Sequence, residues 1–277
     1  MPDILSSSGA KALRPAPAPA PARAKIPGIA RLSVKDIAAL SKTREGRWSP
    51  GLGDQPLHSE IFAPAGEASG AGAALALALD GLHARGREAG NARASAEERS
   101  ILWVQDKAAR RLNGRPYRPG LPESLRHRLI HVAARTPEDA LFALEEGVRC
   151  RDLACVIGEV AGNPRALDFT ASRRLSLAAE KHGAVLFLVR LDAEADLSSA
   201  RMRWQMRAAP SAPPLWNPAA PGRPAWQAQL FRARTHAPGE WTLRDEGSFL
   251  AAERPATAPK DHGDLGLRAG ARSLAAH

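Results

Sequence analysis

The segment between residues 63 and 73 is the part of this sequence best suited to bind an anion. It reads APAGEASGAGA and lies between a run that alternates like a strand (57–63) and a run predicted to be a helix (73–83). At such a junction, backbone amides and a helix N-terminus can surround a phosphate group. The residues of this segment that we compare with a phosphate-binding loop are Gly66, Glu67, Ser69, Gly70, Ala71 and Gly72.

This loop lacks the two side chains that nucleotide hydrolysis requires. A phosphate-binding loop follows its last glycine with Lys, which neutralises the phosphates, and then with Ser or Thr, which binds magnesium. Ala71 and Gly72 stand in those places, and the next lysine is Lys107. We therefore predict a degenerate loop, no ATP turnover and no cofactor. ATP with Mg²⁺ bound by amides alone is one alternative, and a glycine-rich turn used only for packing is another.

Two acidic residues follow apolar runs and are candidates for a second catalytic position. Glu159 follows the run 153–157, where a Walker B strand would carry the acid that orients magnesium-bound water, and Asp106 follows the run 101–104. An acid after a buried strand also occurs for structural reasons. The eight histidines are scattered, so no Ser/His/Asp or Cys/His set and no metal site is predicted. Cys150 and Cys155 are expected to be buried thiols rather than a disulfide.

The charge balance suggests a polyanionic partner. Lys plus Arg number 39 and Asp plus Glu number 29, a net charge of +10. Basic side chains release counterions when they neutralise nucleic-acid phosphates, although an arginine-rich composition also follows from a GC-rich coding sequence. The candidate nucleic-acid or partner surface has two parts. The first comprises Lys107, Arg110 and Arg111. The second comprises Arg201, Arg203 and Arg207, and these three arginines share one strand face because they alternate with apolar residues. The alternative for that strand is a solvated sheet edge whose charges prevent aggregation.

Short apolar runs alternate with capped helical segments along the first two thirds of the chain. This order predicts parallel strands joined by right-handed crossovers, with helices on both faces of the sheet. Three later runs alternate with a period of two and predict an antiparallel extension. The fold class is therefore α/β. We expect a disordered Pro/Ala-rich basic arm (1–27), a short amphipathic helix (28–46), an α/β domain (47–246) and a flexible tail (247–277).

The apolar content and its distribution bound the class of protein. Hydrophobic residues make up 44% of the chain, which excludes collagen-like, coiled-coil and wholly disordered proteins. No uncharged apolar stretch approaches the roughly 18 residues of a membrane span, and the N-terminus has no apolar leader region. We expect a cytoplasmic protein without a membrane partner.

Several of these segments together resemble a known family, that of inducible mutagenesis protein A (ImuA), whose members are RecA-like. The resemblance covers roughly residues 50–245 and is carried by the segments 65–70, 103–106, 154–159, 170–175 and 203–204. Compared with RecA, Glu67, Ser69 and Gly70 match the phosphate loop. Glu159 falls at the Walker B aspartate, and Lys107 falls near the catalytic glutamate.

The resemblance implies a non-catalytic role in damage-induced translesion DNA synthesis, the SOS mutagenesis response. Proteins of this type work with ImuB, an inactive polymerase-like protein, and with an error-prone replicative-type polymerase, and they are linked to RecA. The alternatives are a DNA-stimulated ATPase that uses Glu159, a single-strand DNA-binding protein of the RecA superfamily, and a SulA-like inhibitor of cell division.

Overall fold

The computed structural model describes residues 48–53, 55–88, 98–247 and 249–254. The predicted N-terminal arm, the amphipathic helix and residues 255–277 lie outside these ranges. Every described residue belongs to a single compact unit of the chain, which lies within residues 42–277.

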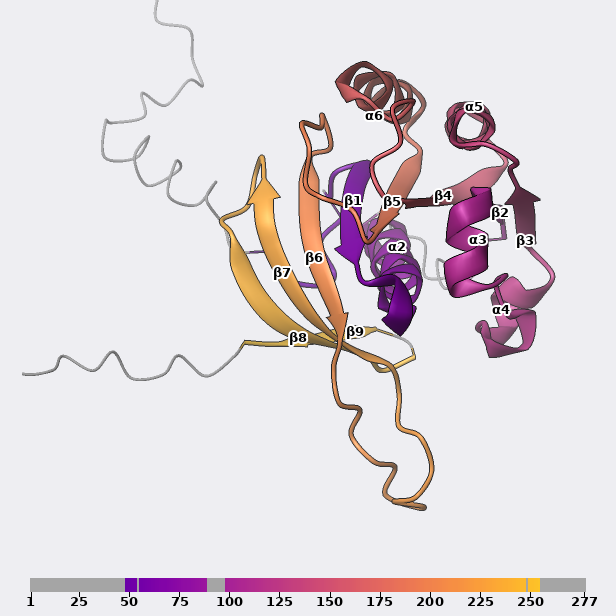
Figure 1. Ribbon diagram of the computed structural model, residues 1–277. Coiled ribbons are helices and arrows are strands. Elements are labelled where there is room, and N and C mark those ends of the chain that lie inside the picture. Colours follow the sequence, from indigo (N-terminus) through magenta and orange to yellow (C-terminus); the bar gives the residue numbers. More distant parts are fainter. Residues whose placement is uncertain (1–47, 54, 89–97, 248, 255–277) are drawn as a thin grey trace, which may run out of the picture. The chain divides into compact units, whose positions relative to one another are not determined.

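The described residues form a sheet of nine strands in the order β3-β2-β4-β5-β1-β6-β7-β8-β9 (Figure 1). The first six of these pair in parallel, and β7, β8 and β9 add an antiparallel extension. The strands are β1 (His58–Ala63), β2 (Ser100–Gln105), β3 (Leu129–Ala133), β4 (Leu153–Ala161), β5 (Val185–Leu191), β6 (Met202–Ala208), β7 (Ala225–Ala233), β8 (Gly239–Asp245) and β9 (Leu250–Glu253).

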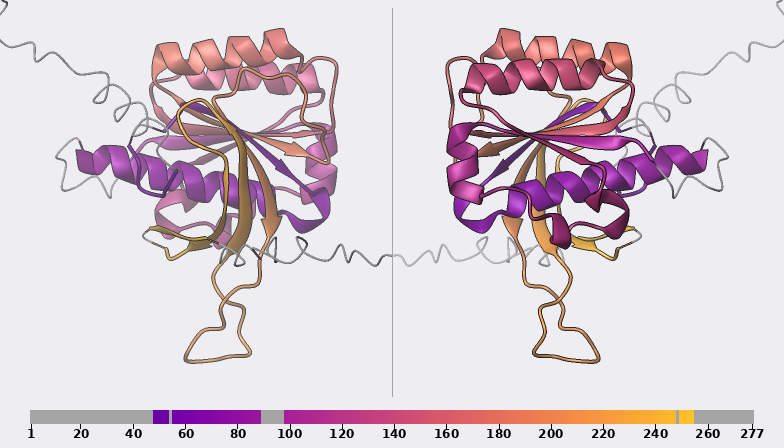
Figure 2. Two further views of the ribbon diagram at one scale, coloured as in Figure 1. Left: turned by 90° about the vertical axis from the view of Figure 1, so that its left-hand side faces the viewer. Right: turned by 90° about the vertical axis from the view of Figure 1, so that its right-hand side faces the viewer.

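Helices cover both faces of the sheet, as predicted. Figure 2 shows α5 and α6 on one face and α2 on the other. The helices are α2 (Ser69–Glu88), α3 (Lys107–Asn113), α4 (Glu123–Arg126), α5 (Pro137–Arg149) and α6 (Phe169–His182), with 3-10 turns η1 (Ala65–Glu67) and η2 (Arg118–Gly120). Together with the strand order, this confirms the α/β class and is consistent with a RecA-like fold. Among the described helices, none is both long and apolar enough to cross a membrane.

Local side-chain and backbone chemistry fixes where α5 begins and where α6 begins and ends. Thr136 and Asp139 form a reciprocal capping box at the start of α5, which satisfies two amides that the helix itself leaves unpaired. Asp168 accepts a hydrogen bond from the amide of Ala171 at the start of α6. Gly183 ends α6 with a φ of 66°, a left-handed conformation that favours glycine.

Two apolar cores form on the two faces of the sheet. The core under α2 is rich in tryptophan, and the ring of Trp48 lies edge-on to Trp204 at 4.8 Å and to Trp241 at 5.3 Å. The core under α5 and α6 is aliphatic and contains Leu144 and Leu188. Strands β2, β4 and β5 therefore bury side chains on both faces, which accounts for their nearly continuous apolar runs.

Two expectations fail near the end of the chain and at one cysteine. The region from residue 247 is expected to be a flexible tail, but it contains strand β9. The backbone of β9 pairs with β8, and Leu250 is buried in the α2-side core, so this part of the chain is ordered. Four residues are too few to display a two-residue period, so the sequence gives no sign of this strand.

The two cysteines differ in exposure. Both are predicted to be buried, but Cys150 is exposed at the C-terminus of α5, and Cys155 is buried.

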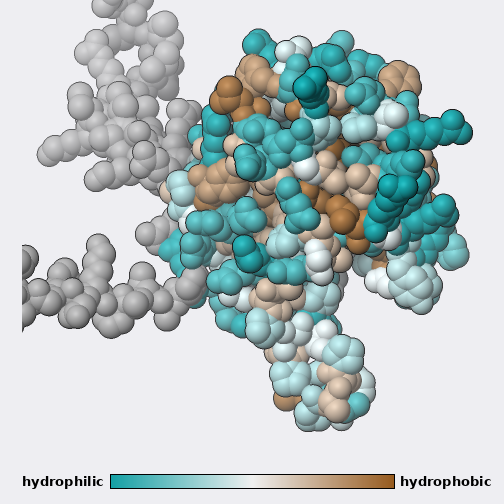
Figure 3. All heavy atoms as spheres, in the orientation of Figure 1, coloured by the Kyte–Doolittle hydropathy of each residue, from teal (hydrophilic) through white to brown (hydrophobic). Residues whose placement is uncertain are grey.

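A long loop joins β6 to β7 and projects from the sheet (Figures 1 and 3). The sequence identifies it as a Pro-rich connector, and between residues 208 and 222 it contains no charged residue. Leu215 and Trp216 are strongly exposed on it.

Candidate functional site

The glycine-rich loop lies where strand β1 gives way to α2, at the carboxyl edge of the parallel strands. It forms the turn η1, and Ala68 then adopts a left-handed φ of 49° before α2 begins at Ser69. Gly70 lies so close to its neighbours that a Cβ atom there would be 2.7 Å from Val189 and 2.8 Å from Ala63. Gly66 has open space around it. Gly70 therefore serves close packing, whereas packing does not require a glycine at position 66.

One carboxylate from outside the loop binds it, and a second belongs to the loop itself. Asp192, at the end of β5, accepts a hydrogen bond from the amide of Ala65 at 3.0 Å. Glu67, a loop residue, accepts one from the amide of Ala208 in β6 at 2.7 Å and one from the Ser69 hydroxyl at 3.4 Å. The amide of Ala65 already serves a carboxylate and is not free for a phosphate, and the negative charge of Asp192 opposes that of a phosphate.

The two positions that would carry the Lys and the Ser or Thr lie at the start of α2. Ala71 is partly buried there. Gly72 faces the indole ring of Trp226 from β7, and a Cβ atom on Gly72 would lie 3.3 Å from that ring. A Thr at this position would require Trp226 to shift. The indole ring thus occupies space beside the position where a magnesium-binding hydroxyl would stand.

Glu159 is buried at the end of β4 and is engaged by three donors. Its Oε1 accepts hydrogen bonds from Trp103 Nε1 at 2.6 Å and Gln105 Nε2 at 3.0 Å, and its Oε2 accepts one from Asn113 Nδ2 at 2.8 Å. Burial raises the pKa of this carboxyl, and the three hydrogen bonds act in the opposite direction. Its side chain therefore ties β2, β4 and α3 together.

The neighbouring Asp106 also has a structural role. Its carboxylate caps α3 by accepting from the amide of Ala109 at 2.6 Å, and its own amide donates to the Glu159 carbonyl. Helix α3 lies beside the turn η1, so the phosphate-loop position, Glu159 and Asp106 do gather at one edge of the sheet. Within the described ranges, no group of three or more His, Cys, Asp or Glu side chains is arranged to hold a metal ion.

The first predicted basic patch is a surface of α3. Lys107 and Arg111 are exposed and Arg110 is half-buried. Burial lowers the pKa of the nearby His131, and the positive charges of Arg115, Arg110 and Arg118 lower it further. Basic side chains from α3 and from the segment after it therefore converge around this histidine.

The second predicted patch does not exist as an exposed face, which corrects the sequence interpretation. Arg203 is buried, and its Nε donates to Glu60 at 2.7 Å. Arg201 is paired with Glu180 at 2.6 Å, and Arg207 is exposed. The cause is the position of β6, which lies between β1 and β7 rather than at a sheet edge. An alternating pattern cannot distinguish an edge strand from an inner strand that buries a charge.

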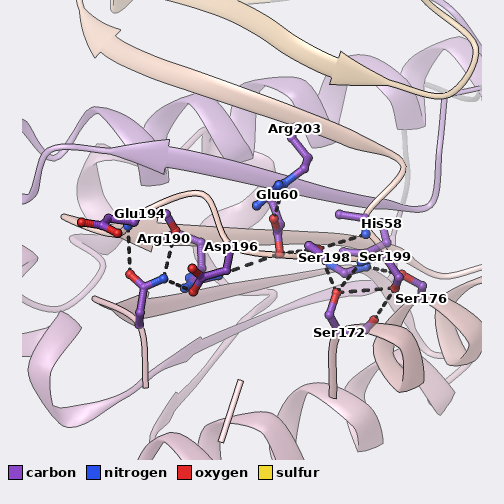
Figure 4. A network of polar contacts seen from close by, with 12 residues as sticks. His58, Glu60, Ser172, Ser176, Arg190, Glu194, Asp196, Ser198, Ser199 and Arg203 are labelled. Atoms are coloured by element: carbon purple, nitrogen blue, oxygen red, sulfur yellow. Dashed lines mark hydrogen bonds and ion pairs between the residues drawn. The ribbon is translucent and has the colours of Figure 1, made fainter. Parts of the chain in front are cut away.

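A polar network extends from this ion pair into the contact between β1 and α6 (Figure 4). Ser198 donates to Glu60 at 2.8 Å and also contacts Ser172 at 2.8 Å. His58 Nδ1 contacts Ser176 at 2.7 Å, and Ser176 contacts Ser199 at 2.6 Å. The network joins β1, α6 and the segment that leads from β5 to β6.

The histidine of this network is not arranged for nucleophilic catalysis. Burial lowers the pKa of His58 to about 4, so the ring is neutral at physiological pH. Its Nε2 atom has no hydrogen-bond partner among the residues that the structure describes, whereas a catalytic Ser–His pair needs an acid on the second nitrogen to orient the ring. We assign these contacts to folding.

Sequence reasoning missed the charged residues at the centre of the sheet. Glu60 and Arg190 stand inside runs that were identified as strands, and both are buried, with Arg190 Nη1 4.0 Å from Glu60 Oε1. A charge inside a run predicted to be buried is a signal for an internal ion pair, because an unpaired buried charge is very costly. Asp192, which binds the glycine-rich loop, gave no such signal.

Comparisons with known proteins agree with the motifs. No family model matches the chain. The chain is 34% identical over 127 residues to Protein ImuA of Caulobacter vibrioides, in strains NA1000/CB15N and ATCC 19089/CIP 103742/CB 15. The aligned region is 42% of this chain and 50% of those proteins, so the chain spans about half the length of the curated relatives it matches. The resemblance to the ImuA family is thereby confirmed over these 127 residues, where the chain is similar to Protein ImuA.

Proposed function

We propose that this protein is a non-catalytic, RecA-like accessory protein of damage-induced translesion DNA synthesis. The observation that carries the proposal is the glycine-rich loop, where Ala71 and Gly72 replace the Lys and Ser or Thr, and where Asp192 binds a loop amide. The similarity to ImuA is the reason for proposing damage-induced translesion synthesis as the process. In this role the α/β domain is a scaffold for protein contacts and has no turnover of its own.

Electrostatics supports the non-catalytic part of this proposal. A nucleotide triphosphate needs positive charge at its β- and γ-phosphates, and a P-loop supplies this charge with a lysine and a magnesium ion. Here Ala71 and Gly72 supply neither the lysine nor a magnesium-binding hydroxyl, and the carboxylate of Asp192 accepts a hydrogen bond from a loop amide. Glu159, the Walker-B-like residue, is bound by three N–H donors and is already engaged in the fold.

The proposed partners follow from the family relationship. They are an ImuB-type polymerase-like protein, an error-prone replicative-type polymerase and RecA. Co-purification of the full chain with each of them tests the adaptor role. A chain that binds none of these proteins would contradict it.

Nucleotide assays test the non-catalytic role separately. We expect ATP hydrolysis at the level of buffer, with or without single-stranded DNA, and no shift of the unfolding temperature at millimolar Mg-ATP. RecA serves as the positive control. Hydrolysis above background that disappears in Glu159→Ala would instead support a DNA-stimulated ATPase.

The basic surface of α3 favours a second candidate function, binding of single-stranded DNA. Among the described residues, Lys107, Arg110 and Arg111 form no ion pair, so their charges are available to phosphates. Binding of oligo-dT through them would weaken with salt, with log affinity falling by about 0.7 per contacted phosphate for each unit of log salt. The double variant Lys107→Ala/Arg111→Ala should reduce that slope. Oligo-dT affinity and slope that are unchanged in this variant would remove the α3 surface from consideration.

A further inference from the structure

A cleft of about 520 Å³ lies between α6, the residues that precede β6, and the end of β7. Figure 1 shows the elements that line it, with the start of β6 and the end of β7 at the upper side of the sheet, near α6. One wall is formed by Phe169, Arg173 and Leu177 of α6, and the other by Arg232 and Arg234 at the end of β7. None of these five residues belongs to the site positions or basic patches predicted from the sequence, and no residue of the glycine-rich loop lines the cleft.

Of the four arginines that line the cleft, Arg201 is paired with Glu180, and the other three carry positive charge that no described side chain neutralises. Arg173, Arg232 and Arg234 are exposed, and none of them forms an ion pair with a described residue. They come from elements far apart in the sequence and converge on the same space. Guanidinium groups in such an arrangement are suited to bind carboxylates or phosphates through paired hydrogen bonds.

Apolar side chains flank this charge on the same helix. Phe169 is 47% exposed and Leu177 is 52% exposed, although α6 buries its opposite stripe in the core. The two residues are eight positions apart, about 12 Å along the helix, and Arg173 lies midway between them. Along this wall of the cleft, the apolar side chain of Phe169, the basic side chain of Arg173 and the apolar side chain of Leu177 therefore follow one another.

The basic surface is short. Glu180, near the end of α6, already neutralises Arg201, which also lines the cleft, so three arginines without an ion pair to a described residue remain for an anion. A nucleic-acid strand carries a phosphate at every step and would extend beyond these three charges. It would also find one aromatic ring for base stacking, that of Phe169, because Leu177 offers no such surface. A short segment that combines acidic and apolar side chains fits both features.

We propose that this cleft binds a short, acidic, amphipathic segment of a partner protein. The apolar side chains of the segment contact Phe169 and Leu177, and its carboxylates pair with Arg173, Arg232 and Arg234. The inference rests on the adaptor role proposed above, and it names the chemistry by which the adaptor recognises a partner.

The floor of the cleft is already ordered by the polar network of Figure 4. Ser176, Ser198 and Ser199 line the cleft and are hydrogen-bonded to His58, Glu60 and Ser172. A floor held in this way does not have to be ordered when the segment binds, which lowers the entropic cost of binding.

Binding of defined probes to the full chain tests the proposal. Fluorescence anisotropy would compare a labelled twelve-residue peptide of Glu, Asp, Leu and Phe with the same peptide carrying Ser in place of Leu and Phe, and with a twelve-nucleotide oligo-dT. We expect the amphipathic acidic peptide to bind most tightly and to weaken with salt. The variant Leu177→Ser should weaken it without any change of charge.

Two adjacent arginines of α6 provide a matched control. Arg173 lines the cleft, whereas Arg174 does not line it and is paired with Glu145 at 2.7 Å. We expect Arg173→Gln to weaken peptide binding at least about tenfold, and Arg174→Gln to have little effect. Thermal unfolding of both variants confirms that each is folded.

Three outcomes would overturn the inference: no binding of the peptide, equal effects of the two glutamine variants, or tighter binding of oligo-dT that depends on Arg173. None of these bears on ATP hydrolysis or on co-purification with the proposed partners. Failure of the inference is therefore distinguishable from failure of the proposed function.

Discussion

The Nε atom of Arg203 lies 2.7 Å from Oε2 of Glu60, and both side chains are buried in the middle of the sheet. The two residues are direct partners in the ladder between β1 and β6. The rings of Phe62 and Phe231 lie against the Arg203 guanidinium, with their centroids at 5.0 and 5.5 Å. A charge that the sequence assigned to the surface is thus an internal contact that helps to hold β6 beside β1.

Replacement of Glu60 by Gln should strongly destabilise the fold. The change removes the carboxylate that faces the buried Arg203 and Arg190, and loss of one partner of a buried ion pair costs about 3–5 kcal/mol of the free energy of unfolding. Urea denaturation followed by circular dichroism measures the loss. Glu145→Gln, which breaks the exposed pair with Arg174, should cost less than about 1 kcal/mol. Equal losses in the two variants would contradict the internal role of Glu60.

The stability of the protein should depend on pH through His58. Burial lowers its pKa from 6.5 to about 4 in the folded state, so between these values the unfolded chain binds more protons. The free energy of unfolding should therefore fall by about 1.4 kcal/mol per pH unit from this group as the pH drops from 6.5 towards 4. Below about 4 the contribution should level off.

The variant His58→Asn isolates this contribution. Burial raises the pKa of Glu159 and of Asp80, so these carboxyls act with the opposite sign, but they titrate in both proteins. The difference between the two pH profiles therefore reports on His58. A difference that does not change between pH 4 and 6.5 would show that the ring is not buried as a neutral base.

Two glycines of α2 should respond oppositely to alanine. In Gly70→Ala the new methyl group would meet Val189 and Ala63 at less than 3 Å, and we expect a loss of about 1–3 kcal/mol from overpacking. Gly81 has nothing within 4 Å of the added atom. Gly81→Ala should therefore stabilise the helix by about 0.5–1 kcal/mol through the reduced entropy of the unfolded chain. Thermal unfolding of the two variants measures both effects, and effects of the same sign would refute the packing argument.

Glu159→Ala should destabilise the protein by removing a shared acceptor. Trp103, Gln105 and Asn113 would lose the carboxylate to which they donate, and unpaired buried donors cost about 1–3 kcal/mol each before the site relaxes. Asn113→Ala removes one of the three bonds and should cost less. A double-mutant cycle between the two positions measures their coupling, and a coupling of zero would mean that this hydrogen bond does not contribute.

The sequence by itself determined the order and the type of most elements. The Thr136 capping box, the glycine that ends α6 and the apolar runs of β2, β4 and β5 depend on neighbours close in the chain, so they are visible in the sequence. The same holds for the missing lysine of the loop, because a residue type at a fixed spacing is a local property. The α/β class and the position of the glycine-rich loop between a strand and a helix follow from these signals.

Only the tertiary structure decided which strands are neighbours and which charges are buried. Glu60 and Arg203 are 143 positions apart, and no local period reports that β6 lies beside β1. For the same reason the sequence did not reveal β9, or the convergence of Arg173 with Arg232 and Arg234 on one cleft. Periodicity specifies which side chains share a face of an element, but packing between distant elements determines whether that face is core, surface or binding site.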